Sequence, residues 1–415
     1  MFGKGFVYLI YEAASIQRWN DHIRPLEFTE IDKQAHKAII ALLLAKFEEE
    51  ENKRKIDWKK LIEGLIFEIL HRIKLTDIKP TVFHRVMLKK RKELNDWVFK
   101  ELEQPLRDIE RGEFYNRFKT YFNNERYGVF EKRIIQAAHY LATYWEFNII
   151  YHVSPKTHLL ENTKIEIESK IEDHYDLIGV QRIYLKKKSF TFLDLCSQLR
   201  FQQRWAQTPR VPKTSVLGHM LIVAILTYVS LLELEACKNR LVYSFYAALF
   251  HDLPEVITRD IVSPVKRSVT ELEEIIKEYE LLQIEEKILP LLPSRWHDEF
   301  RYILGIYPRN SGNKFEKDEF KSRIRKNGNI EFVSTSEINK FYNRDEYKPI
   351  DGEIMKVCDD LAAYVEAVLS IKYGLSSSHL VKGKESLEEK YSMIQPVDER
   401  LDFSSLFYEI GEEIS

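Results

Sequence analysis

Cysteine, glycine and proline are all scarce in this chain of 415 residues. Its three cysteines, Cys196, Cys237 and Cys358, lie far apart and form no C-x-x-C pair. This excludes a disulfide framework and a zinc ribbon, and it favours a reducing, cytoplasmic location. With only 14 glycines and 13 prolines, helix breakers are few, so long helices are expected.

A strong excess of charge of either sign is also missing. The 63 Lys and Arg residues are balanced by 65 Asp and Glu residues, which gives a net charge of −2. This balance argues against electrostatic capture of nucleic acid by the whole chain. Hydrophobic residues make up 44% of the chain and charged residues 31%, so large-scale disorder is not expected either.

One long stretch, 214–232, lacks formally charged residues altogether. It is long enough to approach the length of a membrane span. However, it contains His219 and several small polar residues, Thr214 and Ser230 among them. We therefore expect a buried core helix here and no membrane segment.

Apolar residues recur at helical spacing through most of the chain, and strand-like alternation is rare. The best strand candidate is 330–334. The expected helices cover 38–47, 58–73, 134–150, 217–236, 241–250, 272–289 and 354–371. The sequence thus predicts an all-α fold in which packed helices form the core.

Similar landmarks appear in the same order in the two halves of the chain. The matches are Gln17-Arg18-Trp19 with Gln203-Arg204-Trp205, His36 with His219, His71-Arg72 with His251-Asp252, and His139 with Asp359. Such internal repetition indicates a duplicated unit. We predict a helical domain over 1–152, a polar linker over 153–185, a second copy over 186–375 and a C-terminal tail over 376–415.

The second copy carries an insertion near 309–346. It contains glycines and a basic cluster, Lys321, Arg323, Arg325 and Lys326. The segment is interpreted either as a lid over a site, as an arm that binds a partner, or as a solvated surface loop.

The pattern that carries chemistry is a histidine, then a His-Asp pair, then an aspartate, each on or at the end of an apolar helix. These residues are His219, His251, Asp252 and Asp359. Taken singly, such a histidine is more often a hydrogen-bonded core residue, and a His-Asp pair alone is a weak motif. As a set, they offer a mixed nitrogen and oxygen site for one divalent transition metal, Mn, Co, Ni, Fe or Zn. Such an ion neutralises phosphate charge and lowers the pKa of a water.

This H…HD…D set resembles the HD-domain metal-dependent phosphohydrolase superfamily. The stretch HDLPEVITRDIVSPVK (251–266) and the Arg-Trp pair before the first histidine resemble the bacterial 5′-deoxynucleotidase branch, which removes phosphate from deoxyribonucleoside monophosphates. The resemblance implies a nucleotide substrate. It also implies specific roles: His219, His251, Asp252 and Asp359 as metal ligands, Glu255 and Asp260 as catalytic acids, and Arg204, Trp205, Asp260 and Ser263 as substrate-binding residues.

Each of these roles has a plainer alternative. Trp205 is equally well read as a core aromatic residue and Arg204 as a surface ion-pair partner. Glu255, which follows Pro254, also suits the first turn of a helix, where acidic residues are favoured by the helix dipole. Other substrates of the same site, nucleoside triphosphates or phosphodiesters, remain open, and so does a non-catalytic nucleotide-sensing scaffold.

The first copy is interpreted as a degenerate HD-like domain, the first of two tandem HD-domain bundles. Arg72 stands where the second copy has Asp252, and His139 stands where it has Asp359. Since a guanidinium repels a cation, we expect this copy to bind no metal. The two copies then form an intrachain pseudo-dimer, since the resemblance implies homodimers; alternatively, Arg18, Arg72 and nearby histidines bind a regulatory nucleotide.

Overall fold

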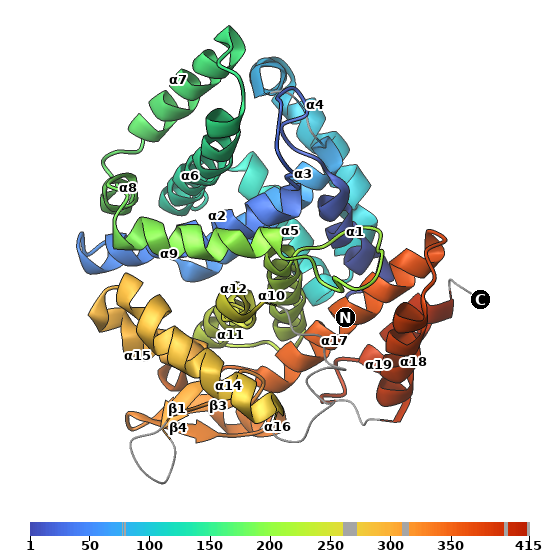
Figure 1. Cartoon of the computed structure of the whole chain (residues 1–415). Coiled ribbons are helices and arrows are strands. Elements are labelled where there is room, and N and C mark those ends of the chain that lie inside the picture. The colour runs from blue at the N-terminus through green and yellow to red at the C-terminus, as the bar shows by residue number, and fades with distance from the viewer. Residues whose placement is uncertain (77, 79, 260–271, 309–314, 394–396, 413–415) are drawn as a thin grey trace. The chain divides into compact units, whose positions relative to one another are not determined.

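The chain forms two compact units in the computed structural model, which describes residues 1–76, 78, 80–259, 272–308, 315–393 and 397–412. The N-terminal unit comprises Gly5–Asp194, and the C-terminal unit comprises Leu195–Ser415 together with Met1–Lys4. Helices dominate both units, and the described strands are very short (Figure 1). The predicted all-α fold is confirmed.

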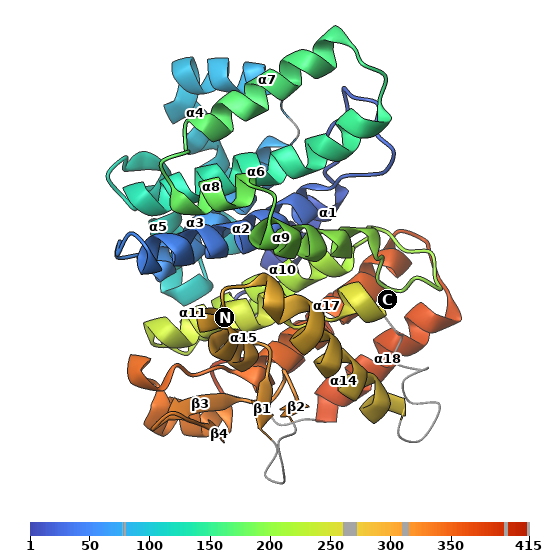
Figure 2. The same cartoon turned by 60° about the vertical axis from the view of Figure 1, so that its left-hand side comes forward.

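The N-terminal unit is organised around α2, which lies along α6 (Figure 2). Thr29 caps the start of α2 by accepting a hydrogen bond from the backbone of Asp32, and acidic residues occupy the first turn. Nearly the whole of α2 is buried, which makes it the central helix of this unit. The helices are α1 (Lys4–Ser15), α2 (Glu30–Glu50), α3 (Trp58–Leu75), α4 (Pro80–Leu106), α5 (Glu113–Asn123), α6 (Val129–Val153), α7 (His158–Glu172), α8 (Ile178–Tyr184) and α9 (Lys188–Ser197).

The C-terminal unit has α10 at its centre, packed against α11 and α17 (Figure 1). By length and composition, α10 is the one helix among the described residues that passes for a membrane span, but 94% of it is buried within the protein. This agrees with the expected core helix. The helices are α10 (Val216–Glu233), α11 (Lys238–Phe250), α12 (Glu255–Thr258), α14 (Leu272–Gln283), α15 (His297–Ile303), α16 (Thr335–Glu337), α17 (Gly352–Lys372), α18 (Ser378–Met393) and α19 (Phe403–Gly411).

Short helical turns complete the two units. The 3-10 turns span Ile109–Gly112, Gln198–Phe201, Leu289–Leu291, Ser294–Trp296 and Asp345–Tyr347, and π-helical turns span Ile284–Ile288 and Ile338–Tyr342. The expected helix over 272–289 therefore ends as a regular α-helix at Gln283.

The insertion contains two antiparallel hairpins. Strand β1 (Ile306–Pro308) pairs with β2 (Phe315–Lys317), and β3 (Arg323–Lys326) pairs with β4 (Asn329–Phe332), close to the strand expected at 330–334. The backbone of the turn after β2 packs closely against two glycines. A Cβ added to Gly305 would lie 2.4 Å from the Asp318 carbonyl oxygen, and one added to Gly352 would lie 2.4 Å from the Phe320 carbonyl carbon.

The basic cluster of the insertion has partners within the C-terminal unit. Buried Arg323 donates to backbone carbonyls, including those of Tyr302 and Ile303. Arg325 forms an ion pair with Asp298 at 2.7 Å. These side chains hold the hairpins in place, so the solvated-loop interpretation does not describe this part of the insertion.

Residues beyond 376, expected as a tail, include two helices that pack on α17. Helices α18 and α19 contact each other and α17. The N-terminal residues join this cluster, because the buried ring of Phe2 meets Phe403 edge to face, with ring centroids 6.5 Å apart. The contacts around α17 thus bring Phe2 together with the two helices that follow residue 376.

The turn that leads into α2 and the turn that leads into α10 have the same hydrogen-bonded form. An isolated antiparallel bridge joins Gln17 to Thr29 in the N-terminal unit, and another joins Gln203 to Ser215 in the C-terminal unit. Both bridges span twelve positions, and in both units the second residue of the bridge caps the helix.

This shared geometry corrects one of the expected matches. Lys33 donates its backbone N–H to the carbonyl of Thr29, and His219 donates to that of Ser215. Counted from the capping residue, Lys33 and not His36 corresponds to His219, which is one helical turn from the expected match. His36 instead packs against Trp145, with ring centroids 5.5 Å apart.

Candidate metal centre

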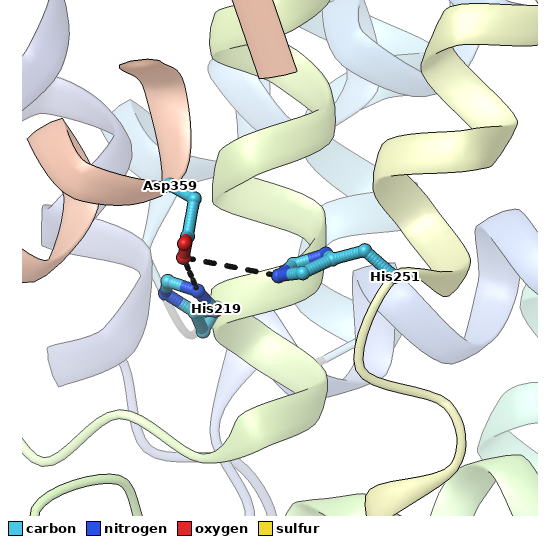
Figure 3. Close-up of side chains that lie close together, drawn as sticks. All are labelled: His219, His251 and Asp359. Carbon is cyan, nitrogen blue, oxygen red and sulfur yellow. Dashed lines mark hydrogen bonds and ion pairs between the residues drawn. The ribbon is translucent and has the colours of Figure 1, made fainter. Parts of the chain in front are cut away.

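Three of the predicted ligands converge in the C-terminal unit (Figure 3). Nε2 of His219, on α10, lies 3.0 Å from Oδ1 of Asp359 on α17. Nε2 of His251, which follows the last residue of α11, lies 3.9 Å from the same oxygen. One ligand atom from each of the three residues lies within 4.8 Å of the others, so the group is able to hold one metal ion.

The protonation pattern of His251 fits a metal ligand. Its Nδ1 lies 2.7 Å from the carbonyl oxygen of Ala248, which only accepts, so Nδ1 carries the proton and Nε2 has a free lone pair. Within the described part of the chain, buried Nε2 accepts no hydrogen bond. An outer hydrogen bond that fixes the tautomer, combined with an inner nitrogen that faces carboxylate oxygens, is typical of metal-binding histidines.

His219 lies beside a buried carboxylate. Its ring is fully buried, and Nδ1 lies 3.7 Å from Oε1 of Glu366. With Nδ1 facing this carboxylate, Nε2 faces Asp359 and the proposed ion. Donor chemistry of this kind, two imidazoles and a carboxylate, suits a divalent transition metal.

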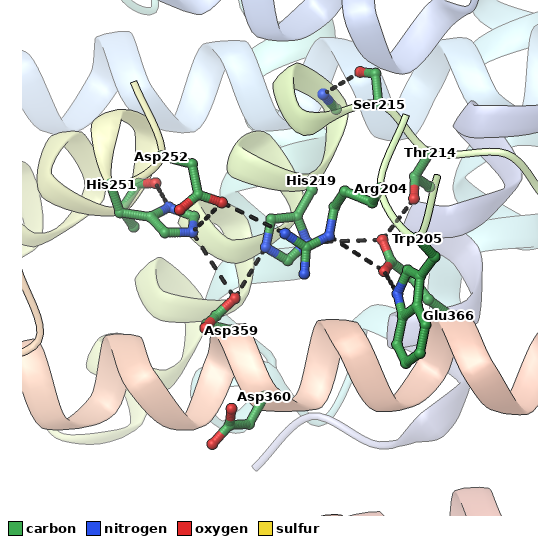
Figure 4. A network of polar contacts seen from close by, with 12 residues as sticks. Arg204, Trp205, Thr214, Ser215, His219, His251, Asp252, Asp359, Asp360 and Glu366 are labelled. Atoms are coloured by element: carbon green, nitrogen blue, oxygen red, sulfur yellow. Dashed lines mark hydrogen bonds and ion pairs between the residues drawn. The ribbon is translucent and has the colours of Figure 1, made fainter. Parts of the chain in front are cut away.

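Glu366 is the centre of the polar network around the metal ligands (Figure 4). Its carboxylate accepts hydrogen bonds from Nε1 of Trp205 at 3.0 Å, from Nε of Arg204 at 3.4 Å and from the hydroxyl of Thr214 at 2.5 Å. Burial alone would raise its pKa, but Arg210 and Arg204 hold the pKa well below its usual value. The sequence interpretation missed this residue, although Glu146 occupies the matching position of the repeat.

Asp252 lies beside the three converging ligands and links them to Arg204. Its Oδ2 is 3.2 Å from Nε2 of His251 and 3.5 Å from Nη1 of Arg204. Burial opposes ionisation of Asp252, yet His251 and Arg204 lower its pKa. The Asp252 charge in turn raises the pKa of His251 against the effect of burial. Arg204 therefore bridges two carboxylates, one at the candidate metal centre and one at Glu366.

Trp205 is held in a fixed orientation next to this bridge. Its indole N–H is bound by Glu366, and its ring reaches α18, where a Cβ added to Gly383 would lie only 2.7 Å from Cη2. The ring is therefore in contact with α18 as well as with the polar network. The sequence did not indicate this contact with the C-terminal segment.

A lysine and an aromatic residue complete the surroundings of Asp359. Nζ of Lys356 lies 2.9 Å from Oδ2 of Asp359, which leaves Oδ1 for the histidines, and 2.9 Å from Oδ1 of Asp360. The same ammonium lies 4.7 Å from the ring centroid of Phe320 in the insertion, and that ring lies 6.0 Å from the ring of His251. The insertion thus reaches the candidate metal centre through an aromatic side chain.

The remaining predicted residues are placed only in part. Glu255 is the first residue of α12 and is buried, and its backbone carbonyl accepts a hydrogen bond from the side chain of Gln202 at 2.9 Å. Asp260 and Ser263 lie outside the described residues.

Residues 196–388 match the family model of the HD domain. This segment is therefore similar to HD domains. All four predicted metal ligands lie inside the matched segment, as do Arg204 and Glu366. An HD domain binds a divalent metal and suggests a metal-dependent phosphohydrolase in general. A search of curated proteins found no match to the chain.

Proposed function

We propose that the HD domain of this protein hydrolyses the 5′-phosphate of deoxyribonucleoside monophosphates. The observation that carries the proposal is the position of Arg204. Its guanidinium touches Asp252, beside the candidate metal centre, and its side chain is 14% exposed, so a phosphate is able to reach it. A planar guanidinium matches two phosphate oxygens at once.

The residues that would hold the ion are His219, His251 and Asp359, with Asp252 proposed as the fourth ligand. When bound, a divalent ion neutralises phosphate charge and lowers the pKa of a water molecule. Lys356 keeps one oxygen of Asp359 engaged, which fixes the direction of the other oxygen. These ligands come from three packed helical segments, so they are held rigidly.

In the proposed reaction, an oxygen–phosphorus bond forms to water and the bond from phosphorus to O5′ breaks. The water loses a proton, and the departing O5′ gains one, so a deoxynucleoside and inorganic phosphate are produced. Buried Glu255, which starts the helical turn after the His-Asp pair, is proposed to transfer the proton. Arg204 stabilises the charge that develops on the phosphate oxygens.

The insertion supports a monophosphate over a more anionic substrate. Arg323 and Arg325 are engaged by backbone carbonyls and by Asp298. The insertion faces His251 with the ring of Phe320, whose centroid lies 6.0 Å from that of His251. An apolar wall favours a nucleoside with one phosphate, whereas a nucleoside triphosphate or a phosphodiester would gain from free cations at this place. Trp205 is proposed to pack on the deoxyribose.

We also propose that the N-terminal unit is a degenerate copy of the HD domain. Arg18 and Trp19 both donate to Glu146, at 3.0 and 2.8 Å, as the C-terminal Arg-Trp pair does to Glu366. The matched lead-in turns before α2 and α10 support the same proposal.

The function is tested with metal-stripped protein, to which Mn²⁺, Co²⁺, Ni²⁺ or Zn²⁺ is added back. Phosphate release is then measured on deoxynucleoside monophosphates, ribonucleoside monophosphates, nucleoside triphosphates and dinucleotides. We expect release from the deoxynucleoside monophosphates only, and none without added metal.

Asp252→Ala is the matched control, because it removes a proposed ligand and leaves the three converging ligands in place. Release that survives in Asp252→Ala would place the activity elsewhere. Preferred turnover of triphosphates would reject the monophosphate specificity, and the absence of turnover on every substrate would favour a nucleotide-sensing scaffold.

A further inference from the structure

The N-terminal unit contains a buried ionic cluster at the place that corresponds to the candidate metal centre. Lys33 follows the helix-capping residue by four positions, as His219 does in the C-terminal unit. Its Nζ lies 2.6 Å from Nδ1 of His139, which the repeat matches with Asp359. The pair Lys33–His139 therefore stands where the pair His219–Asp359 stands, with a side-chain amine in place of an imidazole.

Near Lys33, the N-terminal unit differs from the C-terminal unit by one added positive side chain and one added negative side chain, which pair with each other. Arg72 occupies the position matched with Asp252, and Glu30 occupies the first helical position, where α10 has Val216. Arg18 donates to Glu30 at 2.8 Å, and Nε of Arg72 lies 3.7 Å from the same carboxylate. Arg18 thus keeps a carboxylate partner, Glu30, although Arg72 stands at the position where the C-terminal unit has Asp252.

The surroundings of Lys33 are unfavourable for a second cation. Lys33 is fully buried, and within the described residues no carboxylate oxygen lies within 4 Å of its Nζ. Burial lowers the pKa of Lys33, and Arg18 and Lys37 lower it further, against the effect of Glu30. The pKa of His139 is lowered for the same reasons, burial first and then the nearby lysines and arginines. A potential that disfavours an added proton also disfavours a divalent ion.

We infer that Lys33, which stands at the position of the first histidine ligand, fills the metal position of the N-terminal unit with its own amine. In this unit the ligand set is replaced by the contact between Lys33 and His139, with Glu30 paired to two arginines beside it, an arrangement that needs no metal. The inference rests on the metal centre proposed for the C-terminal unit, because that centre is the reference for the comparison.

Metal content per chain tests the inference on the full-length protein. The protein is stripped with a chelator, incubated with excess Ni²⁺, desalted and analysed for nickel. We expect the wild type to retain about one ion per chain, and the variant His251→Ala/Asp359→Ala to retain none. Nickel that remains in that variant and disappears when Lys33→Met and His139→Ala are added would overturn the inference.

A rebuilt N-terminal centre gives the complementary test. In the variant that lacks the C-terminal centre, Glu30→Val, Lys33→His, Arg72→Asp and His139→Asp are introduced together. We expect this protein to gain about one nickel ion per chain, while a matched variant that keeps Lys33 and carries the other three changes gains none.

The two proposals fail in different ways. A rebuilt variant that retains wild-type helicity by circular dichroism but binds no nickel would show that Lys33 does not stand in a metal position. Nickel bound equally by the matched variant with Lys33 would show the same. Absence of nickel from the wild type, with nickel gained by the rebuilt variant, would instead count against the C-terminal centre and support the inference.

Discussion

Glu366→Gln is the substitution whose effect the structure defines most closely. The change keeps the size of a side chain that is fully buried and removes its negative charge. Trp205 donates to one carboxylate oxygen and Thr214 to the other, so the single oxygen of a glutamine amide is able to accept only one of these two hydrogen bonds. The guanidinium of Arg210, however, is 2% exposed and lies 3.8 Å from this carboxylate, so it loses a charged partner inside the protein.

The expected loss of stability is several kcal/mol. At an effective dielectric constant of about 20, two unit charges about 4 Å apart attract by about 4 kcal/mol. Part of this attraction offsets the cost of burying the charges. Removal of one partner of a buried pair typically destabilises a protein by about 3–5 kcal/mol. We therefore expect Glu366→Gln to lower the free energy of unfolding by about 3 kcal/mol at neutral pH.

The pH dependence of this loss follows from the pKa of Glu366. The folded pKa lies well below the ordinary value of 4.5, so the carboxylate contributes stability above that value. This contribution disappears as the pH falls through the folded pKa. The difference between wild type and Glu366→Gln should accordingly be full at neutral pH and shrink in acid.

Urea unfolding at several pH values, followed by circular dichroism, measures the difference. The matched control is Glu389→Gln, which removes one negative charge from an exposed position on α18. We expect the control to change stability by less than about 0.5 kcal/mol. If the two variants unfolded at the same urea concentration, the view of Glu366 as the electrostatic centre of this unit would be refuted.

Three further outcomes are expected. Arg204→Lys keeps the charge but loses the planar fork, so kcat/KM for phosphate release should fall by roughly tenfold or more, with circular dichroism unchanged. Metal affinity, followed by calorimetric titration, should fall as the pH drops, because Asp252 raises the pKa of His251 and protons compete for Nε2; an affinity equal at pH 5.5 and pH 8 would contradict this. Gly352→Ala should cost about 1–3 kcal/mol of stability, because its Cβ would overlap the backbone of Phe320, whereas Gly3→Ala meets open space and should be neutral.

The long helices were predictable because their apolar residues repeat with the helical period. The helix expected over 58–73 is observed as Trp58–Leu75, and that over 354–371 as Gly352–Lys372. The β-hairpins were harder to predict from the sequence. Their position depends on Gly305 and Gly352. Because these residues have no Cβ, the backbone at Asp318 and Phe320 is able to pack directly against them. Contacts of this kind join distant residues and leave no local pattern.

The proposed repeat could be read from the sequence, but its exact register could not. His36 and Lys33 lie on the same face of α2, three residues apart, so a shift by one turn preserves the apolar pattern. The hydrogen bonds of the lead-in turn resolve this ambiguity. Likewise, the sequence alone does not distinguish Glu366 from the other charged residues of its helix. Its importance comes from Arg204 and Trp205, which precede it by more than 150 positions.

The contact between Phe2 and Phe403 has a consequence for how the protein is made. A ribosome that adds about 5–20 residues per second needs about 20–80 s to travel between these two positions. During that interval the aromatic side chain near the start of the chain lacks its final neighbour. Phe2 is therefore expected to reach its final packing only after Phe403 has been synthesised.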